Sequence, residues 1–241
     1  IDVYMLPFIK PAHVRKYFAE TDIESYTDAL YAVLKDLKIN PANRNVLITH
    51  QFVTGALRSD SEDISVGGAD NVDATVFEPF DYVALGHIHR PQYIGKETVR
   101  YCGTPLKYSF SEAGHTKSVT VVELFDKNET GLRQVPLIPK RDMREFKGLY
   151  MEVTSRRFYE GTNTDDYLHI TLTDEEDIPD AIGKLRAIYP NIMKLDYDNT
   201  RTRSAADISG AENIEARPPI DLFDEFYEKQ NNQRLSELQK L

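Results

Sequence analysis

Two histidines stand two positions apart directly after an apolar run in the segment VALGHIH, residues 83–89. A third histidine, His50, closes the apolar run NVLIT in the same way. Side chains two apart in a strand point to the same side, so we expect His87 and His89 to face one cavity, which His50 joins from a second strand end. Neutral imidazole binds manganese, zinc and iron. The spacing therefore predicts a transition-metal site.

The alternative interpretation is three unrelated histidines, partly buried and hydrogen-bonded to the backbone. Gly86 favours the metal site, because a residue without a side chain lets a ligand approach the backbone closely. His13 follows a proline turn and His169 alternates within the strand-like YLHITL, so both are interpreted as structural. His115 lies in a loop beside Lys117, where a phosphate contact competes with a plain solvated loop.

Composition places the chain among globular proteins. Its 241 residues are 41% hydrophobic and 28% charged, and no apolar run approaches the roughly 20 residues that span a bilayer. The single cysteine, Cys102, excludes an internal disulfide framework and fits a reducing cytoplasm, which is the location we expect. The first residues, IDVYMLPF, read as a strand already in progress, so we expect a piece of a longer protein.

The charge is distributed unevenly. The net charge is −10, but residues 86–118 hold five basic against two acidic side chains, a local balance of +3. Residues 152–241 hold 19 acidic against 11 basic ones. The histidine pair therefore lies in a mildly basic neighbourhood that is compatible with a phosphate-bearing substrate.

The elements that must position the histidines are mostly strands. One helix is predicted over residues 21–39, where Thr21 and Glu24 form a capping box. Residues 55–72 have a loop composition. Strands are predicted at 45–50, 81–87, 98–103, 118–124 and 132–138. Because no long helices separate most of them, we expect a largely antiparallel or mixed sheet.

A charged stretch, residues 139–148, is the predicted domain boundary. Beyond it, a small α+β unit is predicted from β-rich segments at 149–155 and 166–174, a helix at 180–190 and a strand at 192–198. A polar linker is predicted at 199–219 and a helical tail from Asp221. One side of this tail helix carries the apolar residues Leu222, Phe223, Phe226 and Tyr227.

Four segments together resemble a known family. GHIH after a strand, with TH ending an earlier one, is similar to the last two ligand motifs of calcineurin-like metallophosphoesterases. NVLITHQFVTG, FDYVALGHIHRPQ, VRYCGTPLKYSFSEAGHTKSV and PIDLFDEFYEKQN resemble bacterial SbcD nuclease subunits, from about Leu6 to about Gln230. The pair GHxH alone is moderately specific, and RYCGTPLKYSFSE beside it makes the resemblance strong.

The resemblance implies an α/β fold: the C-terminal half of a four-layer metallophosphoesterase sandwich, a small α+β capping domain and a C-terminal helical tail. The expected domains are residues 1–140 for the nuclease part, 147–215 for the cap and 219–241 for the tail. The cap would help to select the form of the DNA, and the tail would dock on a partner. A tail helix that folds back on the cap is the alternative.

The resemblance also implies two metal ions, usually manganese, with His50 and His87 on one ion and His89 on the other. The family's D-x-H, G-D-x-x-D and G-N-H-D motifs, which supply a bridging aspartate and the general acid, do not occur in this sequence. Three neutral imidazoles do not replace a bridging carboxylate. We therefore expect the chain alone to bind at most one ion weakly, to contain no catalytic residue of its own and to cleave no DNA.

For the full-length protein, the resemblance implies hydrolysis of DNA phosphodiesters in repair, replication and recombination. The expected activities are 3′→5′ exonuclease on duplex ends and endonuclease on single strands and hairpins. The expected partners are DNA, the ATPase SbcC and a second copy of the protein, without a membrane. Residues close in sequence to the metal ligands are predicted to contact phosphates: Arg90, Lys107, His115 and Lys117.

Two other function classes remain open at this point. One is a calcineurin-like phosphoesterase that acts on small phosphoesters or proteins, which a hairpin-DNA assay on the full-length protein distinguishes. The other is a non-catalytic module that docks on an ATPase through the tail. Pull-down before and after replacement of Phe223 and Phe226 by alanine distinguishes that one.

Overall fold

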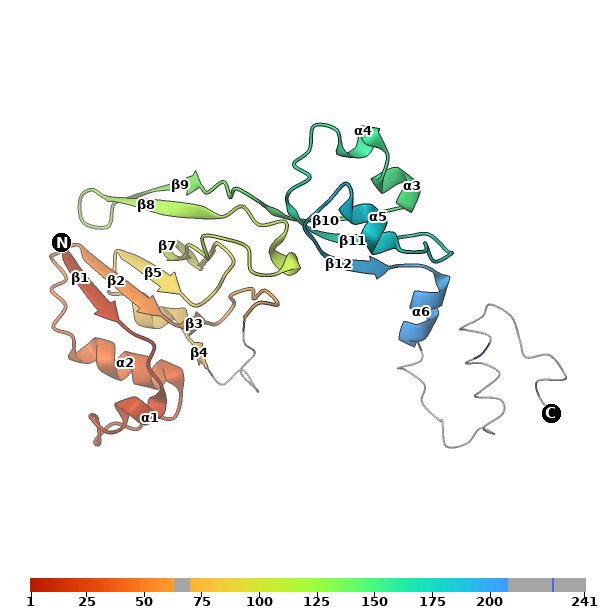
Figure 1. Ribbon diagram of the computed structural model, residues 1–241. Coiled ribbons are helices and arrows are strands. Elements are labelled where there is room, and N and C mark those ends of the chain that lie inside the picture. Colours follow the sequence, from red (N-terminus) through yellow and green to blue (C-terminus); the bar gives the residue numbers. More distant parts are fainter. Residues whose placement is uncertain (63–69, 208–226, 228–241) are drawn as a thin grey trace, which may run out of the picture. The chain divides into compact units, whose positions relative to one another are not determined.

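The computed structural model describes residues 1–62, 70–207 and 227, which form a mixed α/β structure as predicted (Figure 1). The chain divides into two compact units, Ile1–Met143 and Arg144–Leu241, and each has its own hydrophobic core. Within the described residues, no helix has both the length and the apolar character that crossing a membrane requires.

The first unit is built on a five-stranded sheet of order β1-β2-β5-β7-β6. Its strands are β1 (Asp2–Leu6), β2 (Asn45–His50), β5 (Tyr82–Gly86), β6 (Gln92–Ile94) and β7 (Lys96–Tyr101). The first four in this spatial order run parallel, and β6 alone pairs antiparallel with β7. The sheet is therefore mixed, as one of the two expectations had it, but mainly parallel. In parallel neighbours, the carboxyl ends of the strands meet at one edge of the sheet.

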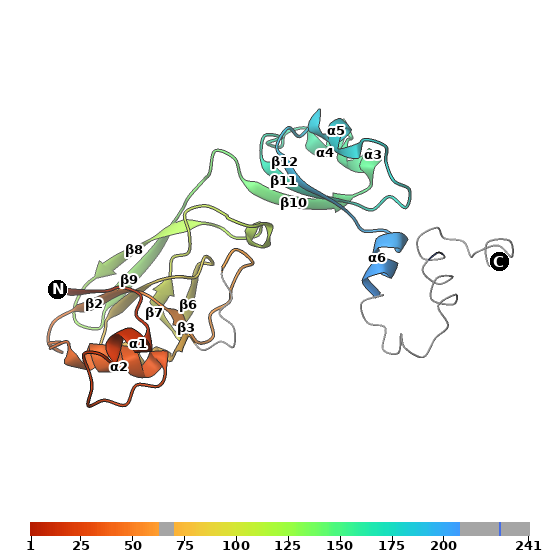
Figure 2. The ribbon, with the colours of Figure 1, turned by 60° about the horizontal axis from the view of Figure 1, so that its bottom comes forward.

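Short elements surround this sheet. Figures 1 and 2 show helices α1 and α2 on one side of it and the β8–β9 hairpin on the other. The helices are α1 (Pro11–Val14), α2 (Tyr26–Asp36) and the 3-10 turns η2 (Ala74–Phe77) and η3 (Phe110–Glu112). The further strands are β3 (Phe52–Val53), β4 (Asn71–Val72), β8 (Ser118–Leu124) and β9 (Thr130–Pro136). Residues 118–124 thus form a strand as predicted, whereas the expected loop at 55–72 ends in strand β4.

Helix α2 begins later than the sequence pattern predicts. Ser25 is its N-cap: the Ser25 hydroxyl accepts the Asp28 N–H, and the Asp28 carboxylate accepts the Ser25 N–H. This capping box lies further along the chain than the expected box at Thr21. It fixes the start of the helix because it satisfies two otherwise unpaired backbone donors. The buried face of α2 includes Leu30 and Leu34.

The core of the first unit lies under the sheet, and one part of the sheet stays open. Fully buried members of the core include Leu30, Leu47, Val53, Val72, Val83 and Tyr101. On β1 and β2, by contrast, Val3 is 55% exposed, Met5 80% and Ile48 44%. These three apolar side chains form an exposed apolar face on the two strands at the sheet's edge.

The second unit has a three-stranded sheet of order β10-β11-β12. Its elements are β10 (Met143–Gly148), α3 (Tyr150–Val153), α4 (Arg156–Tyr159), β11 (Tyr167–Leu172), α5 (Ala181–Arg186), β12 (Ile192–Tyr197) and α6 (Thr200–Asp207). Strand β11 alternates strictly, and its residues Leu168, Ile170 and Leu172 are fully buried against Leu185 and Tyr189. Period-two alternation with one buried face is typical of a strand that packs on helices.

Three predictions in this unit are corrected. The sequence predicts a strand at 149–155, but α3 occupies 150–153, because the carboxylates of Glu152 and Asp174 accept the N–H groups of Leu149 and Tyr150. The predicted boundary stretch contains the division between Met143 and Arg144, but part of it forms the strand β10, which the sequence did not predict. The predicted linker begins with helix α6, where Asn199 and Thr202 exchange side chain–backbone hydrogen bonds and so cap the helix.

Candidate functional site

His50 and His87 meet at the carboxyl edge of the parallel sheet. Strands β2 and β5 pair in parallel with His50 opposite Gly86, so the residue after β5 lies beside the end of β2. The two imidazole rings are 5.3 Å apart between centroids and perpendicular, at 88°. Two of the three imidazoles singled out by the sequence are therefore neighbours, as their places at strand ends predict.

Gly86 leaves the space that the His50 ring fills. A Cβ at position 86 would lie 2.8 Å from His50 Nδ1, closer than side chains normally approach. Glycine is thus needed here for close approach and not for backbone freedom, since its φ is not positive.

The backbone from His87 to His89 does not continue strand β5. β5 ends at Gly86, and His87 adopts a φ of 111°, an uncommon value for a residue with a side chain. Strand alternation therefore does not relate His87 to His89, and that part of the prediction is corrected. Strained backbone of this kind persists where the surrounding structure holds it in place, and it gathers at functional sites.

Two phenylalanine rings pack beside the histidine pair, in which His50 is exposed and His87 is half-buried. Phe8 stacks parallel to His87, with 6.3 Å between ring centroids and 5° between planes, and it meets His50 edge-on at 6.4 Å. Phe52 lies 6.1 Å from His87 on another side. Burial lowers the pKa of His87 below its usual value, and the neighbouring His50 lowers it further. At neutral pH, His87 therefore carries a free nitrogen lone pair.

His89 has a separate polar environment. Its Nδ1 lies 2.7 Å from the hydroxyl of Ser61, which donates to the carboxylate of Glu112 at 2.5 Å. Glu112 is fully buried and forms an ion pair with Lys117, whose side chain is 3% exposed. Burial acts to raise the pKa of Glu112, but hydrogen bonds from Lys117 and Ser61 outweigh it and hold that pKa below its ordinary value. Glu112 is therefore ionised.

The imidazoles fit part of a metal-binding set. In the ranges 1–62 and 70–207, no group of three or more histidine, cysteine, aspartate or glutamate side chains is close enough to hold a metal ion. His50 and His87 fit two positions around one transition ion, which accepts neutral imidazole nitrogen. Whether His89 holds a second ion stays a prediction.

The four residues predicted to contact phosphate lie in different surroundings. Arg90 is exposed. Lys107, His115 and Lys117 line one cavity of about 310 Å³. The Lys107 ammonium pairs with Asp142, and the Lys117 ammonium donates to Glu112 and two further protein oxygens. These internal contacts give both lysines a structural role. DNA contact stays a prediction for all four residues.

The histidines interpreted as structural are placed within the fold. His13 lies in α1. His169 lies on β11, as its alternation predicts, and its two ring nitrogens are 2.7 and 2.8 Å from carboxylate oxygens of Glu145 and Asp196. These two histidines lie outside the candidate site as described.

Sequence reasoning missed the residues that support His89. Ser61 lies in the segment expected to be a loop, and Glu112 lies in the segment SFSE, which entered only through the resemblance. A fully buried carboxylate has no signal in sequence composition, because its burial depends on the distant Lys117 and Ser61. The tail residues Leu222, Phe223 and Phe226 lie outside the described residues, of which the tail contributes only Tyr227.

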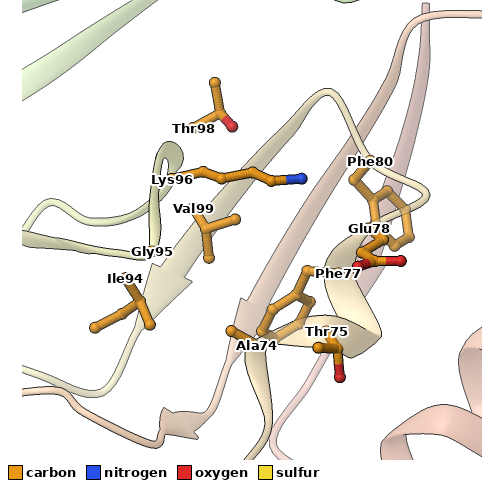
Figure 3. A pocket seen from close by; sticks show the side chains of 10 residues that line it. All are labelled: Ala74, Thr75, Phe77, Glu78, Phe80, Ile94, Gly95, Lys96, Thr98 and Val99. Atoms are coloured by element: carbon orange, nitrogen blue, oxygen red, sulfur yellow. The ribbon is translucent and has the colours of Figure 1, made fainter.

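A second surface depression lies away from the histidines. Its volume is about 150 Å³, and Figure 3 shows the side chains that line it, which come from η2, from the residues just after it, from the β6–β7 turn and from strand β7. The lining residues are Ala74, Thr75, Phe77, Glu78, Phe80, Ile94, Gly95, Lys96, Thr98 and Val99. No histidine is among them, so this depression is separate from the candidate metal centre.

Two comparisons with known proteins find sequences similar to this chain. Residues 139–231 match the SbcD_C family model, described as the type 5 capsule protein repressor C-terminal domain. The chain is 32% identical over 245 residues to a Staphylococcus epidermidis protein that is named as a subunit of the nuclease SbcCD. That match covers 99% of this chain and 64% of the relative, so the chain spans somewhat under two thirds of the relative's length. The chain is therefore similar over almost its whole length to a nuclease subunit, and over residues 139–231 to the SbcD_C domain model.

Proposed function

We propose that the full-length protein carrying this chain is a metal-dependent nuclease that hydrolyses DNA phosphodiesters. The observation that supports it is the meeting of the His50 and His87 rings, 5.3 Å apart, at the carboxyl ends of parallel strands. Ligand sites of open parallel sheets lie beyond these strand ends. The relative named as part of a nuclease supports the same reaction class.

In this proposal, His50 and His87 hold one manganese ion and His89 contributes to a second. Bound divalent ions at such a centre polarise a phosphoryl oxygen and lower the pKa of bound water. In this proposal, the residues of this chain bind the metal ions and orient the DNA. His87 stays neutral through burial, the Phe8 and Phe52 rings pack beside His87, and the exposed Arg90 attracts the phosphate backbone.

The proposed substrates are duplex DNA ends, cleaved as a 3′→5′ exonuclease, and single strands and hairpins, cleaved as an endonuclease. These activities would act in DNA repair, recombination and replication. They rest on the resemblance of the motifs in this sequence and on the similarity to the SbcCD subunit and to the SbcD_C domain model.

We further propose that this chain alone is inactive. The described residues bring no carboxylate together with His50 and His87 as a metal-binding group, so nothing there offsets the repulsion between two divalent ions. The apolar side chains of Val3, Met5 and Ile48 are exposed on the sheet. This exposure supports the proposal that further residues of a longer protein pack on that face and complete a sandwich. The relative's greater length supports it too.

The proposed assembly contains DNA, the ATPase SbcC and a second copy of the protein, in the cytoplasm. The name of the relative describes one part of the nuclease SbcCD, which supports a partner chain. The tail is the proposed docking segment for SbcC, through Leu222, Phe223, Phe226 and Tyr227, on the strength of their spacing in the sequence. The location rests on the single cysteine.

The test uses the full-length protein, with and without its ATPase partner, on a hairpin DNA and on a blunt duplex. We expect manganese-dependent cleavage that a chelator abolishes and that His87→Ala reduces by at least about 100-fold. His13→Ala is the matched control and should keep full activity. Turnover of small phosphoesters without DNA cleavage would instead identify a different phosphoesterase. Robust cleavage by residues 1–241 alone would contradict the proposed inactivity of this chain.

A further inference from the structure

The Lys117–Glu112 ion pair is buried beside His89. The side chain of Glu112 is 0% exposed and that of Lys117 is 3% exposed. A buried ion pair contributes little net stability compared with well-packed apolar residues. Because stability alone does not explain this buried pair, its position beside His89 indicates a role in the function of that histidine.

Several hydrogen bonds at and around this pair converge on His89. Lys117 Nζ donates to the backbone carbonyl of His89 at 2.8 Å, and the Thr104 N–H donates to the same carbonyl at 3.2 Å. The His89 N–H donates to the Glu62 carboxylate at 2.5 Å. The backbone of His89 is thus held on both sides by charged groups.

The ring of His89 is held through a relay. A carboxylate paired with an ammonium only accepts hydrogen bonds, so the Ser61 hydroxyl must donate its proton to Glu112, 2.5 Å away. The Ser61 oxygen then accepts from His89 Nδ1, 2.7 Å away. This order of donors places a proton on Nδ1 of His89 and leaves the lone pair on Nε2.

We propose that Glu112, held ionised by Lys117 and acting through Ser61, is a positioning residue that fixes the tautomer and orientation of His89 so that Nε2 faces a divalent cation. This inference rests on the proposed function for the identity of the cation. The geometry around His89 is independent of it. In the part of the chain that the structure describes, Nε2 has no hydrogen-bond partner, as a ligand nitrogen requires. Partners of this kind raise the basicity of a ligating imidazole and fix its ring.

Ser61→Ala is the variant that tests the relay, because Ser61 is only half-buried and the Glu112–Lys117 pair stays intact. Ser61→Thr keeps a hydroxyl and serves as the rescue. Ser111→Ala is the matched control: its hydroxyl accepts the Asp60 N–H and so anchors the same loop, but it does not touch His89.

The first measurement is the tautomer of His89 in the metal-free, full-length protein, read from ¹⁵N shifts of labelled histidine. We expect the Nδ1–H form in the unaltered protein and in Ser61→Thr, and a mixture of tautomers in Ser61→Ala. A proton on Nε2 in the unaltered protein would overturn the proposal, as would a Ser61→Ala spectrum identical to that of the parent.

The second measurement is Mn²⁺ affinity, by titration calorimetry on the same proteins. We expect Ser61→Ala to bind Mn²⁺ about 10- to 100-fold more weakly, with Ser61→Thr and Ser111→Ala close to the parent. An equal loss of Mn²⁺ affinity in Ser111→Ala would show that the effect comes from anchoring of the loop, and it would contradict the proposed hydrogen-bond chain from Glu112 through Ser61 to His89. If the parent binds no Mn²⁺, the proposed function fails, and the tautomer measurement still decides the positioning role.

Discussion

The ring of His87, which directly follows β5, lies edge-on to the ring of His50 at the end of β2, with 5.3 Å between the ring centroids. The parallel register, which sets His50 opposite Gly86, produces this contact. The candidate metal centre therefore depends on three local conditions: the register of β2 and β5, the absence of a side chain at position 86 and the positive φ of His87.

Gly86→Ala should disable the metal centre with little loss of stability. The new Cβ would lie 2.8 Å from His50 Nδ1, and the movable histidine ring would yield more readily than the backbone. A displacement of about 1 Å at a reacting centre costs about 100-fold in rate. The measurement is nuclease activity and Mn²⁺ affinity of the full-length variant.

Gly114→Ala is the matched control for that variant, because a Cβ there meets nothing within 4 Å and its φ is not positive. It should behave as the parent protein in both assays. An active, metal-binding Gly86→Ala protein would show that the position of the His50 ring is not required.

Tyr101→Phe should destabilise the end of β2. The fully buried Tyr101 hydroxyl donates to the Gln51 carbonyl at 2.7 Å and accepts the Val53 N–H at 2.9 Å. Burial raises the pKa of this hydroxyl, so it stays protonated and able to donate. Leaving two buried backbone groups without a partner should lower the free energy of unfolding by about 1–3 kcal/mol, measured with urea.

The exposed Tyr93 offers the control for that measurement. Tyr93→Phe, at a residue 52% exposed, should change stability by less than about 0.5 kcal/mol. Equal effects of the two substitutions would remove the assigned role of the Tyr101 hydroxyl.

Asp81→Asn should destabilise the start of β2 in a pH-dependent way. The Asp81 carboxylate accepts from the Asn45 N–H at 2.7 Å, the Asn128 N–H at 3.1 Å and the Lys127 ammonium at 2.6 Å. Burial acts to raise the pKa of Asp81, but these hydrogen bonds, led by Lys127, outweigh it and leave the pKa below its usual value. We expect a loss of about 1.5–3 kcal/mol at neutral pH.

The sign of the pH dependence follows from that lowered pKa. Folding favours the ionised carboxylate, so its contribution is complete above the unfolded pKa, about 4, and is lost as the pH falls through the lower folded pKa. Urea unfolding of parent and Asp81→Asn between about pH 2 and pH 7 should therefore give stabilities that converge below about pH 4. A constant difference at all these pH values would contradict the assignment.

Ile170→Ala should weaken the second unit without changing the metal centre. Ile170 is fully buried in the core that surrounds β11. Its truncation should cost about 2–5 kcal/mol in unfolding free energy, whereas Met193→Ala, at a residue 62% exposed, should cost less than about 0.5 kcal/mol. Because His50 and His87 lie in the first unit, we expect Mn²⁺ affinity to be unchanged at a temperature where both proteins are folded. A parallel loss of affinity would show that the units are coupled.

The sequence predicts elements well where apolar periodicity is strong and local. Residues 45–50 and 118–124 form strands with the predicted bounds, because an apolar run flanked by polar residues has few alternatives. The predictions of helix and strand bounds that failed did so because side chain–backbone hydrogen bonds set the local structure. Asp28 outcompeted Glu24 as the capping partner, and Asp174, distant in sequence, helped to turn 150–153 into a helix.

Local sequence pattern also predicted one part of the candidate site and not the other. The sequence predicted that His50 and His87 lie close together, because each falls at the end of an apolar run, but it did not predict the mainly parallel sheet that brings the strand ends to one edge. The support of His89 was not, because it joins Ser61, Glu112 and Lys117 from three separate segments. Tertiary structure alone brings these together.

Anomalous diffraction of manganese in crystals of the full-length protein would decide whether the two paired rings form a metal site. We expect a manganese peak within bonding distance of imidazole nitrogens of both His50 and His87. Manganese bound only elsewhere, with these two rings contacting no ion at saturating Mn²⁺, would contradict the assignment.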